Sequence, residues 1–403
     1  MANRVVIIGQ GYTGRLSIVR SVASLGCDVT LIVLLPRSVF EKDKRIRPID
    51  AYSKYVGRVL FSENYNSQML ISILQNQCVD PNQKTILFPD NDFSAATIDN
   101  HRDILKEHFY IPHIHERQGA IEEWMDKVRQ KALAERLGLN VVNAEIIEIK
   151  EGHYSIPETI SYPCFAKPLM SIVGGKNGLK KCNSTKELEH HIDFLLSLHD
   201  NFRILVEDFK TIEREYATLG FSDGNEVIIP GILELLHIGH GNHYGVAVQG
   251  RVSPISEEFN TLVEQFKALV KEIGFVGIFD IDFYKSQGRF YFCELNLRFG
   301  GSGYAFTKMG VNLPAMLVKY FFGENYVDMN KTVQGTALYF NERMAIDDWY
   351  AGYISQKEFS RYRDESDIKF VDDDEDMSPQ KVLNKEYRIK LIKKSIKKWI
   401  GRE

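Results

Sequence analysis

The sequence lacks the features that mark secreted, disulfide-bonded or membrane-spanning proteins. Its five cysteines are odd in number and include no Cys-x-x-Cys pair, so free thiols are expected instead of a disulfide framework or a zinc–cysteine site. No run of about 18 apolar residues predicts a membrane span. The first residues enter a strand without the charged region and cleavage site of a signal peptide. These absences predict a cytoplasmic protein.

An excess of one charge, internal repeats and low-complexity linkers are also missing. The net charge of −4 argues against a general nucleic-acid-binding protein. Hydrophobic residues make up 44% and charged residues 26% of the chain, as is typical of a globular protein. A length of 403 residues exceeds one ordinary core, so two or three domains are expected.

The N-terminal segment predicts a β–α–β unit. Arg4–Ile8 has the pattern of a buried strand, and Gly9-x-Gly11-x-x-Gly14 leads from it into a helix that precedes a second strand at Val29–Leu35. This turn is typical of dinucleotide-binding proteins. The second strand, however, ends without the acidic residue that would bind a ribose hydroxyl, so a dehydrogenase is the weaker interpretation.

A β-hairpin is predicted within residues 274–303. Two aromatic and β-branched runs, Gly277–Tyr284 and Arg289–Arg298, flank the turn residues Ser286–Gly288. Because the side-chain period of a strand is two, the loop length decides which residues face each other. A three-residue loop would place Asp280 opposite Glu294, and a longer one would separate them.

Polar residues in these apolar strands indicate a cation site. Asp280 and Asp282 share one face of the first strand, and Glu294, Asn296 and Arg298 share one face of the second. Carboxylates in such surroundings need a cation. Acidic and amide oxygens beside an Arg suit Mg²⁺ and a polyphosphate. The alternative is an edge hairpin with solvated charges.

A second phosphate-binding element is predicted around a glycine-rich loop. The strand Tyr162–Lys167 is followed by Ser171–Gly178, whose backbone N–H groups can surround a phosphate with Lys167 and Lys176 as charge partners. The spacing is not that of a Walker loop, and a plain glycine-rich turn is the alternative. Helical periodicity predicts a helix over Ile121–Leu137, with Gly138 at its end.

Two further polar segments allow more than one interpretation. Pro89–Asp92 follows a predicted strand, where open α/β sheets place ligands, but Asp92 alone is expected to be a helix N-cap. His237, His240 and His243 lie in a glycine-containing loop, which favours a mobile loop near a substrate over a zinc site.

The C-terminal segment is strongly charged. Asp372–Asp376 is expected to be a solvated loop. Lys381–Glu403 carries nine Lys and Arg residues, and a helix there would either dock on the protein, which is the preferred interpretation, or lie on an anionic membrane surface. Its apolar stripe consists of Ile389, Ile392, Ile396, Trp399 and Ile400.

Over residues 1–325 these motifs together resemble the ATP-grasp superfamily, in the group of carboxylate–amine ligases related to carbamoyl-phosphate synthetase and biotin carboxylase. The most specific match is Asp282, followed twelve positions later by Glu294-x-Asn296-x-Arg298. The resemblance implies an α/β and α+β fold in four parts: a Rossmann-like pre-ATP-grasp domain (1–118), an ATP-grasp small lobe (119–205), a large lobe with a Mg²⁺ site (206–330) and a C-terminal extension with a basic amphipathic helix (331–403).

The resemblance also assigns expected roles. Asp282, Glu294 and Asn296 would hold Mg²⁺, with two ions expected and Mn²⁺ as a substitute. Arg298 and Lys167 would be catalytic, and Arg298 would stabilise the acyl phosphate. The residues expected to bind ATP are Lys127, Lys167, Ser171, Gly174, Gly175, Lys176, Glu207, Asp208, Phe209 and Glu215, the last through the ribose hydroxyls.

The implied activity is an ATP-dependent ligase that activates a carboxylate as an acyl phosphate and couples it to an amine, such as an amino acid or peptide. Another ATP-grasp reaction, forming an acyl or carbamoyl phosphate, and a non-catalytic nucleotide-binding module are the alternatives. Small molecules are the expected partners, without nucleic acid. A homo-oligomer and a peripheral contact of residues 381–403 with the inner membrane face remain open.

Some positions depart from the family pattern. Asp282 stands where relatives often have Glu, and Ser171–Gly178 has fewer glycines than usual. No biotinyl domain follows, which counts against biotin carboxylation. The C-terminal part, with Trp349 and Gly352, resembles that of D-aspartate ligase-like proteins.

Overall fold

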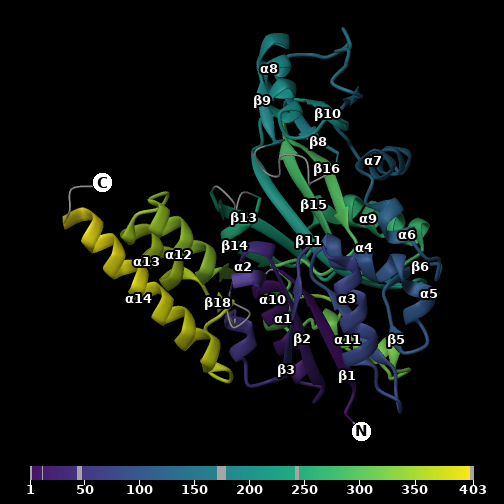
Figure 1. Cartoon of the computed structure of the whole chain (residues 1–403), viewed down its shortest axis with the longest axis vertical. Helices are drawn as coiled ribbons and strands as arrows, with labels where there is room; N and C mark the ends of the chain where they lie inside the picture. Colours follow the sequence, from purple (N-terminus) through teal and green to yellow (C-terminus); the bar gives the residue numbers. More distant parts are fainter. Residues whose placement is uncertain (1, 11, 43–47, 170–177, 241–244, 400–403) are drawn as a thin grey trace. The chain divides into compact units, whose positions relative to one another are not determined.

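The structure is a computed structural model that describes residues 2–10, 12–42, 48–169, 178–240 and 245–399 (Figure 1). It contains two compact units. Unit 1 consists of Met1–Met125, Glu215–Asp282 and Leu295–Glu403, and unit 2 of Asp126–Arg214 and Phe283–Glu294.

Unit 1 begins with a five-stranded parallel sheet in the order β3-β2-β1-β4-β5. Its strands β1, β2 and β4 are apolar and buried on both faces, as parallel strands covered by helices are. One face packs on α1 (Tyr12–Ala23), and the other on α3 (Ser67–Ile73) and α4 (Asp92–Asn100). The predicted β–α–β unit is therefore confirmed. The strands are β1 (Arg4–Gly9), β2 (Asp28–Leu35), β3 (Val56–Glu63), β4 (Thr85–Pro89) and β5 (Phe109–Tyr110).

A second, largely antiparallel sheet follows the order β16-β15-β11-β13-β14-β17-β18, with β12 and β6 at its side. The amphipathic α9 (Asn260–Ile273) precedes its central hairpin. The strands are β6 (His113–Ile114), β11 (Arg214–Asp223), β12 (Val227–Ile228), β13 (Ile232–Ile238), β14 (Ala247–Ser253), β15 (Phe275–Ser286), β16 (Arg289–Asn296), β17 (Ala337–Phe340) and β18 (Ile368–Lys369).

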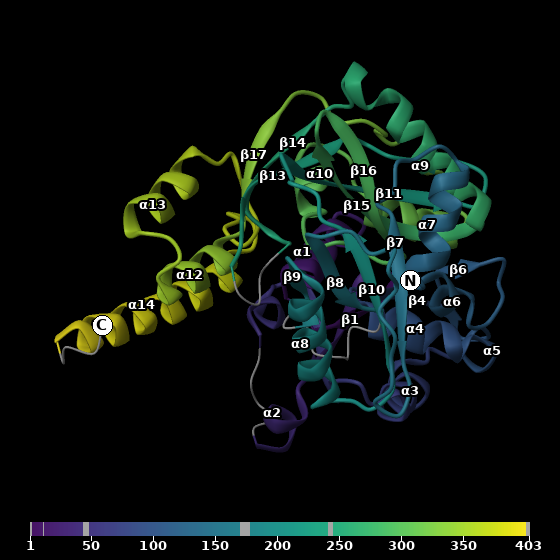
Figure 2. The ribbon, with the colours of Figure 1, turned by 90° about the horizontal axis from the view of Figure 1, so that it is seen from above.

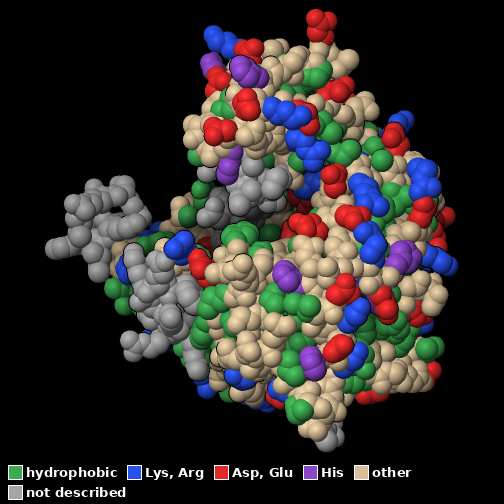
Figure 3. Space-filling view, turned by 45° about the vertical axis from the view of Figure 1, so that its right-hand side comes forward, with side chains coloured by type: hydrophobic (Ala, Val, Ile, Leu, Met, Phe, Trp, Pro, Cys, Tyr) green, Lys and Arg blue, Asp and Glu red, His purple; other side chains and the backbone are tan. Residues whose placement is uncertain are grey.

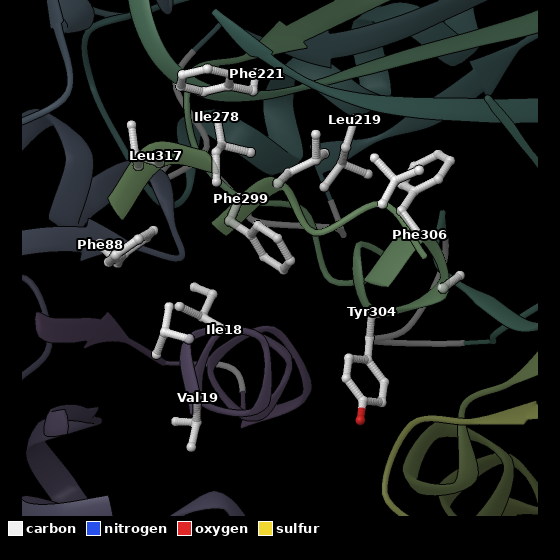
Figure 4. Close-up of a cluster of buried hydrophobic side chains, with 14 of the residues drawn as sticks. Ile18, Val19, Phe88, Leu219, Phe221, Ile278, Phe299, Tyr304, Phe306 and Leu317 are labelled. Carbon is white, nitrogen blue, oxygen red and sulfur yellow. The ribbon is translucent and has the colours of Figure 1, made fainter. Parts of the chain in front are cut away.

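One hydrophobic core joins the two sheets of unit 1. Figure 4 shows Ile18 of α1 and Phe88 of β4 beneath Phe299, Ile278 and other side chains of the second sheet. The helices α10 (Tyr304–Lys308) and α11 (Leu313–Phe321) complete this core. Apolar burial on this scale is the dominant stabilising contribution, so the N-terminal sheet is a structural part of unit 1.

The chain ends in three helices, α12 (Glu342–Ala351), α13 (Gln356–Glu365) and α14 (Met377–Trp399), which lie together in Figure 2. Leu383 of α14 is fully buried, and the Tyr387 ring stacks on Phe359 at a centroid distance of 5.5 Å. Further along the helix, Ile389 and Ile392 are 44% and 59% exposed. The first half of α14 is thus docked on the protein. The side chains of Ile396, Trp399 and Ile400 lie outside the described part.

The acidic run before α14 was expected to be a solvated loop, and that prediction is wrong for Asp373 and Asp376, whereas its other three acids are exposed. Asp376 is 1% exposed and accepts a hydrogen bond from Arg20 Nε at 3.1 Å. Asp373 is 8% exposed and accepts bonds from Tyr304 Oη and Lys308 Nζ, both at 2.7 Å. The buried cationic and hydroxyl partners are the reason that these carboxylates can leave water.

Unit 2 contains an antiparallel sheet in the order β7-β10-β8-β9, with α8 (Thr185–Leu196) packed on one face. The predicted helix over Ile121–Leu137 is confirmed with one interruption, because the chain forms α6 (Ala120–Trp124) and then α7 (Lys127–Arg136). Asp126 starts α7 by accepting hydrogen bonds from the N–H groups of Val128 and Arg129. The strands are β7 (Ala144–Ile149), β8 (Cys164–Pro168), β9 (Lys180–Cys182) and β10 (Phe202–Asp208).

The hairpin is confirmed, but its loop is one residue shorter than predicted. Strand β15 continues through Ser286, and the loop is Gln287-Gly288 with φ values of 50° and 72°. Positive φ at both positions is the signature of a type I′ turn. The rings of Tyr284 and Tyr291 stack across it at 5.5 Å. The predicted placement of Asp280 directly opposite Glu294 required a three-residue loop. Because the loop has two residues, that placement is no longer supported.

Among the helices of the described ranges, none has the length and apolar character required to cross a bilayer. Acidic and basic side chains are interspersed over the face drawn in Figure 3.

Candidate active site

Three lysines and two glutamates form a cluster of ion pairs in unit 2. Lys127 Nζ lies 2.5 Å from Glu294 Oε2. Lys167 Nζ lies 2.9 Å from Glu207 Oε2, and Lys131 pairs with the other carboxylate oxygen of Glu207. The predicted residues Lys127, Lys167, Glu207 and Glu294 therefore share one cluster, and Lys131 joins them.

Secondary structure brings these side chains together. Lys127 and Lys131 are separated by one helical turn of α7, so they project from the same face. In the antiparallel pair of β10 and β8, Lys167 is opposite Leu205, which places Glu207 on the same face as its diagonal neighbour. Lys131 was missed in the sequence because a lysine on a helix is usually solvated, whereas this side chain is 10% exposed.

Burial lowers the pKa of two of the lysines. The pKa of Lys131 falls to about 7, through burial first and then through the charges of Lys167 and Lys127. The pKa of Lys167 falls to about 8, again through burial and then Lys127. Like-charged neighbours held in a partly dry site favour an anionic ligand, because the ligand supplies the counter-charge.

A cavity of about 560 Å³ lies beside this cluster within unit 2. Its walls come from α7, the start of β7, the end of β10 and the segment 159–161, and its lining includes Lys131, Glu207 and Asp208. This volume is within the range of small-molecule sites. Phe209 follows directly, with its N–H donating to Pro163 O at 3.1 Å and Lys181 Nζ 4.0 Å from its ring centroid.

The predicted acid, amide and guanidinium of the hairpin form a second group, in unit 1. Asn296 Nδ2 donates to Asp282 Oδ2 at 3.2 Å, and Arg298 Nη2 donates to Asn296 Oδ1 at 3.3 Å. Arg298 Nη1 also lies 3.8 Å from Asp280 Oδ2. Asp282 of β15, Asn296 at the end of β16 and Arg298 just after it therefore form one hydrogen-bonded row.

Arg298 has a further partner in Asp92, whose Oδ1 accepts a hydrogen bond from Nε at 3.0 Å. The expectation that Asp92 caps α4 is wrong. Asn91 is the N-cap and accepts the N–H of Ser94, which leaves the Asp92 carboxylate to bind Arg298. Burial alone would lower the pKa of Arg298, but Asp92 and Asp280 raise it above its ordinary value.

Asp282 and Asn296 in unit 1, and Glu294 in unit 2, carry carboxylate and amide oxygens, the hard donors that Mg²⁺ prefers. The Asn296 amide nitrogen donates to Asp282 and its oxygen accepts from Arg298, so these three side chains adjoin one another. Within the described ranges, no cluster of three or more His, Cys, Asp and Glu side chains has the geometry of a metal site.

The remaining predicted residues lie elsewhere or outside the described part. Glu215 is the second residue of β11, opposite Leu235, and burial raises its pKa. The His237 ring stacks on Tyr362 at 4.1 Å, and His240 Nδ1 lies 2.9 Å from Asp348 Oδ2. The described residues thus give the zinc interpretation no support. The predicted loop residues Ser171, Gly174, Gly175 and Lys176, and also His243, lie outside the described residues.

Residues 132–313 match the ATP-grasp domain family. The chain therefore contains an ATP-grasp domain, in agreement with the resemblance of its motifs and with the predicted fold class.

Solved structures share this fold. Biotin carboxylase from Campylobacter jejuni, in a β-γ-ATP complex, is 18% identical with a TM-score of 0.62, over 84% of this chain and 75% of that chain. The biotin carboxylase domain of 2-oxoglutarate carboxylase from Hydrogenobacter thermophilus, with MgADP, ADP and bicarbonate, is 16% identical with a TM-score of 0.61, over 84% and 74%. An L-amino acid ligase from Bacillus licheniformis is 18% identical with a TM-score of 0.59, over 83% and 79%.

Proposed function

We propose that the protein is an ATP- and Mg²⁺-dependent ligase that joins a carboxylate to an amine. The observation that carries this proposal is the hydrogen-bonded row of Asp282, Asn296 and Arg298, together with the lysine-paired Glu294 two residues before Asn296. The similarity to an L-amino acid ligase and to biotin carboxylases supports it.

In this proposal the lysine cluster binds the nucleotide. Lys127 and Lys167 contact its phosphates, since both are paired with carboxylates and a polyphosphate competes well for such cations. The segment Glu207–Phe209 binds the adenine, and Glu215 binds the ribose hydroxyls. The loop residues Ser171, Gly174, Gly175 and Lys176 cover the phosphates.

The metal requirement follows from the hard oxygen donors. Asp282, Glu294 and Asn296 would hold Mg²⁺, which when bound neutralises charge on the phosphate groups. We propose two ions, with Mn²⁺ as a substitute. One Mg²⁺ keeps part of its water shell and is usually bound by one or two carboxylates, so the oxygens of three side chains can serve more than one ion.

The chemistry follows from the weak electrophilicity of a carboxylate. A carboxylate oxygen attacks the γ-phosphorus, ADP leaves, and an acyl phosphate forms. The amine nitrogen then attacks the acyl carbon, the C–N bond forms, phosphate leaves and the amine loses a proton. Arg298 stabilises the acyl phosphate and the tetrahedral oxyanion, because its position is fixed by Asp92 and Asn296 before the charge develops.

A screen for ADP release tests the proposal. Wild-type protein with ATP and Mg²⁺ is expected to release ADP only when a carboxylate and an amine are both present, and mass spectrometry should find a product equal to their sum less one water. Glu294→Gln should reduce the rate at least 100-fold. The matched control is Glu264→Gln on exposed α9, which should leave the rate unchanged.

Different outcomes separate the alternatives. Unchanged ADP release in Glu294→Gln would refute the site assignment. A product that is an acyl or carbamoyl phosphate, without an amine adduct, would identify another ATP-grasp reaction. ATP binding without turnover of any carboxylate would identify a nucleotide-binding module.

The proposal does not extend to a membrane. The described part of α14 is held by α12 and α13, with Lys394 Nζ donating to Trp349 O at 2.8 Å and Arg343 bound to Glu386.

A further inference from the structure

One buried acid of unit 1 has no role in the reaction described above. Asp90 follows directly after β4, and its N–H donates to Ile8 O of β1 at 2.9 Å. The order β3-β2-β1-β4-β5 reverses between β1 and β4, so Asp90 stands at the carboxyl-end switch point of the parallel sheet. Open α/β sheets bind their ligands at such a point.

The sheet end is built to admit the Asp90 carboxylate. A Cβ atom at Gly9 would lie 1.3 Å from Asp90 Oδ1, so only glycine at that position leaves room for the carboxylate. A Cβ at Gly14 would lie 3.6 Å from Asp90 Oδ2 and 4.0 Å from the Cα of Gly301. Backbone without side chains therefore surrounds the acid on two sides, and the segment after Arg298 approaches it.

The carboxylate is also under-satisfied for a buried acid. Asp90 Oδ1 is buried and has no hydrogen-bond partner among the residues that the structure describes. Burial raises the pKa of Asp90 to about 7, although Arg15, Arg298 and a hydrogen bond from the Gln10 backbone oppose the rise. Nearby Asp50 is fully buried but binds Arg15 Nε at 2.6 Å. A buried acceptor without a partner is uncommon in a folded protein and calls for a ligand or a function.

The charges at this edge are complementary to a zwitterion. Asp90 offers a negative group that lacks a full complement of donors, and Arg298, which binds Asp92 two residues further along at 3.0 Å, offers a positive one. An α-amino acid carries an ammonium and a carboxylate two bonds apart on one carbon. A carboxylic acid without an ammonium group would bind Arg298 but would leave the Asp90 carboxylate without an additional donor.

We propose that Asp90 binds the ammonium group of an α-amino acid whose carboxylate is activated beside Arg298. This inference rests on the proposed ligase function and deepens it, because it names the class of the activated substrate. Asp90 is a substrate-binding residue in this role and takes no part in bond formation. Gly9 and Gly14 serve by leaving space for the acid and its ligand.

Trapping of the acyl phosphate by hydroxylamine tests the inference. Hydroxylamine attacks the acyl carbon, phosphate leaves, and a hydroxamate is measured without any need for the natural amine. The donors are the common L- and D-α-amino acids, each paired with the acid that lacks only the α-amino group, for example alanine with propionate. The proteins are the full-length wild type, Asp90→Asn and Asp103→Asn, an exposed acid of α5 (Arg102–Leu105) as control.

The wild type is expected to form hydroxamate from at least one amino acid with a KM at least tenfold below that of its deaminated partner. Asp90→Asn should raise the KM for that amino acid at least tenfold, with the KM for ATP unchanged. The wild-type preference for amino acid over deaminated acid needs no variant, so it tests the inference even if Asp90→Asn fails to fold.

An equal KM for the two members of each pair in the wild type, or an unchanged KM in folded Asp90→Asn, would overturn the inference. Hydroxamate from other carboxylates but from no amino acid would also overturn it, while the ligase function would stand. Absence of hydroxamate from every carboxylate would overturn both.

Discussion

Arg298 and Asp92, which are 206 positions apart in the sequence, form an ion pair with 3.0 Å between Nε and Oδ1. The pair links the segment after β16 to the first turn of α4, both in unit 1. Because Asn91 caps that helix, the Asp92 backbone is fixed and its carboxylate can hold the guanidinium. The position of the proposed oxyanion-stabilising group thus depends on the N-terminal sheet.

Asp92→Asn is expected to loosen Arg298 without removing it. The neutral amide can still accept one hydrogen bond, but it loses the charge-assisted component. The rate of product formation should fall about tenfold, which corresponds to about 1.4 kcal/mol, while the KM for ATP stays the same. Steady-state kinetics beside Asp103→Asn would measure this, and an equal change in the KM for ATP would refute a role confined to Arg298.

Lys131→Met is expected to weaken ATP binding. Glu207 is shared by Lys131 and Lys167, so removing one cation leaves the carboxylate competing with the nucleotide for Lys167 alone. We expect the Kd for ATP to rise about tenfold, with a smaller change in kcat. Titration calorimetry measures it, with Lys267→Met on α9 as the control. An unchanged Kd would show that Glu207 does not compete with the nucleotide for Lys167.

The lowered lysine pKa values predict how ATP affinity depends on pH. Lys167, with a pKa of about 8, and Lys131, with a pKa of about 7, are protonated and cationic below these values and neutral above them. Phosphate binding needs the cations, so affinity should be highest below pH 7 to 8 and fall several-fold as the pH rises toward 9. Affinity that is constant over this range would mean that the bound nucleotide restores both pKa values.

The sequence predicted those features that depend on local spacing. The alternation of a strand suffices to place Asn296 and Arg298 in reach of one another, and a helical turn suffices to align Lys127 with the cluster. The contact of Asp282 with Asn296 depends in addition on the register of two strands. The N-terminal sheet was likewise predicted from the sequence, because near-continuous apolar runs are typical of parallel strands that are buried on both faces.

The errors arose where a partner is distant in the sequence. Asp92 was expected to cap a helix because Arg298 is far along the chain, and Asp376 was expected to be solvated because its partner Arg20 precedes it by 356 positions. The loop of the hairpin was misjudged by one residue because Ser286 fits either a strand or a turn. Only tertiary packing resolves these choices.

Asp373→Asn is expected to destabilise the protein at neutral pH but not in acid. The bonds from Lys308 and Tyr304 outweigh burial and hold the pKa of Asp373 at about 2, below its ordinary 3.8. A carboxyl group whose pKa is lower in the folded than in the unfolded protein stabilises the folded state at pH values above the unfolded-state pKa. This stabilisation is lost as the pH falls from about 4 to 2. The difference from wild type should therefore be about 1–2 kcal/mol at pH 7 and should shrink through that window. Denaturant unfolding measures it, with exposed Asp374→Asn as the control; a constant difference would exclude this ion pair as the cause.

Two substitutions on α14 test how far that helix is docked. Leu383 is fully buried among the aromatic side chains of α12 and α13, so Leu383→Ala should remove about 2–5 kcal/mol of unfolding free energy through lost contacts and the cavity that remains. Ile392 is 59% exposed, so Ile392→Ser should change stability by less than about 0.5 kcal/mol. Urea unfolding of both variants distinguishes the two halves of the helix. A loss in Ile392→Ser as large as that in Leu383→Ala would mean that the second half is covered in solution, because a side chain can lose burial energy only where a partner excludes water from it.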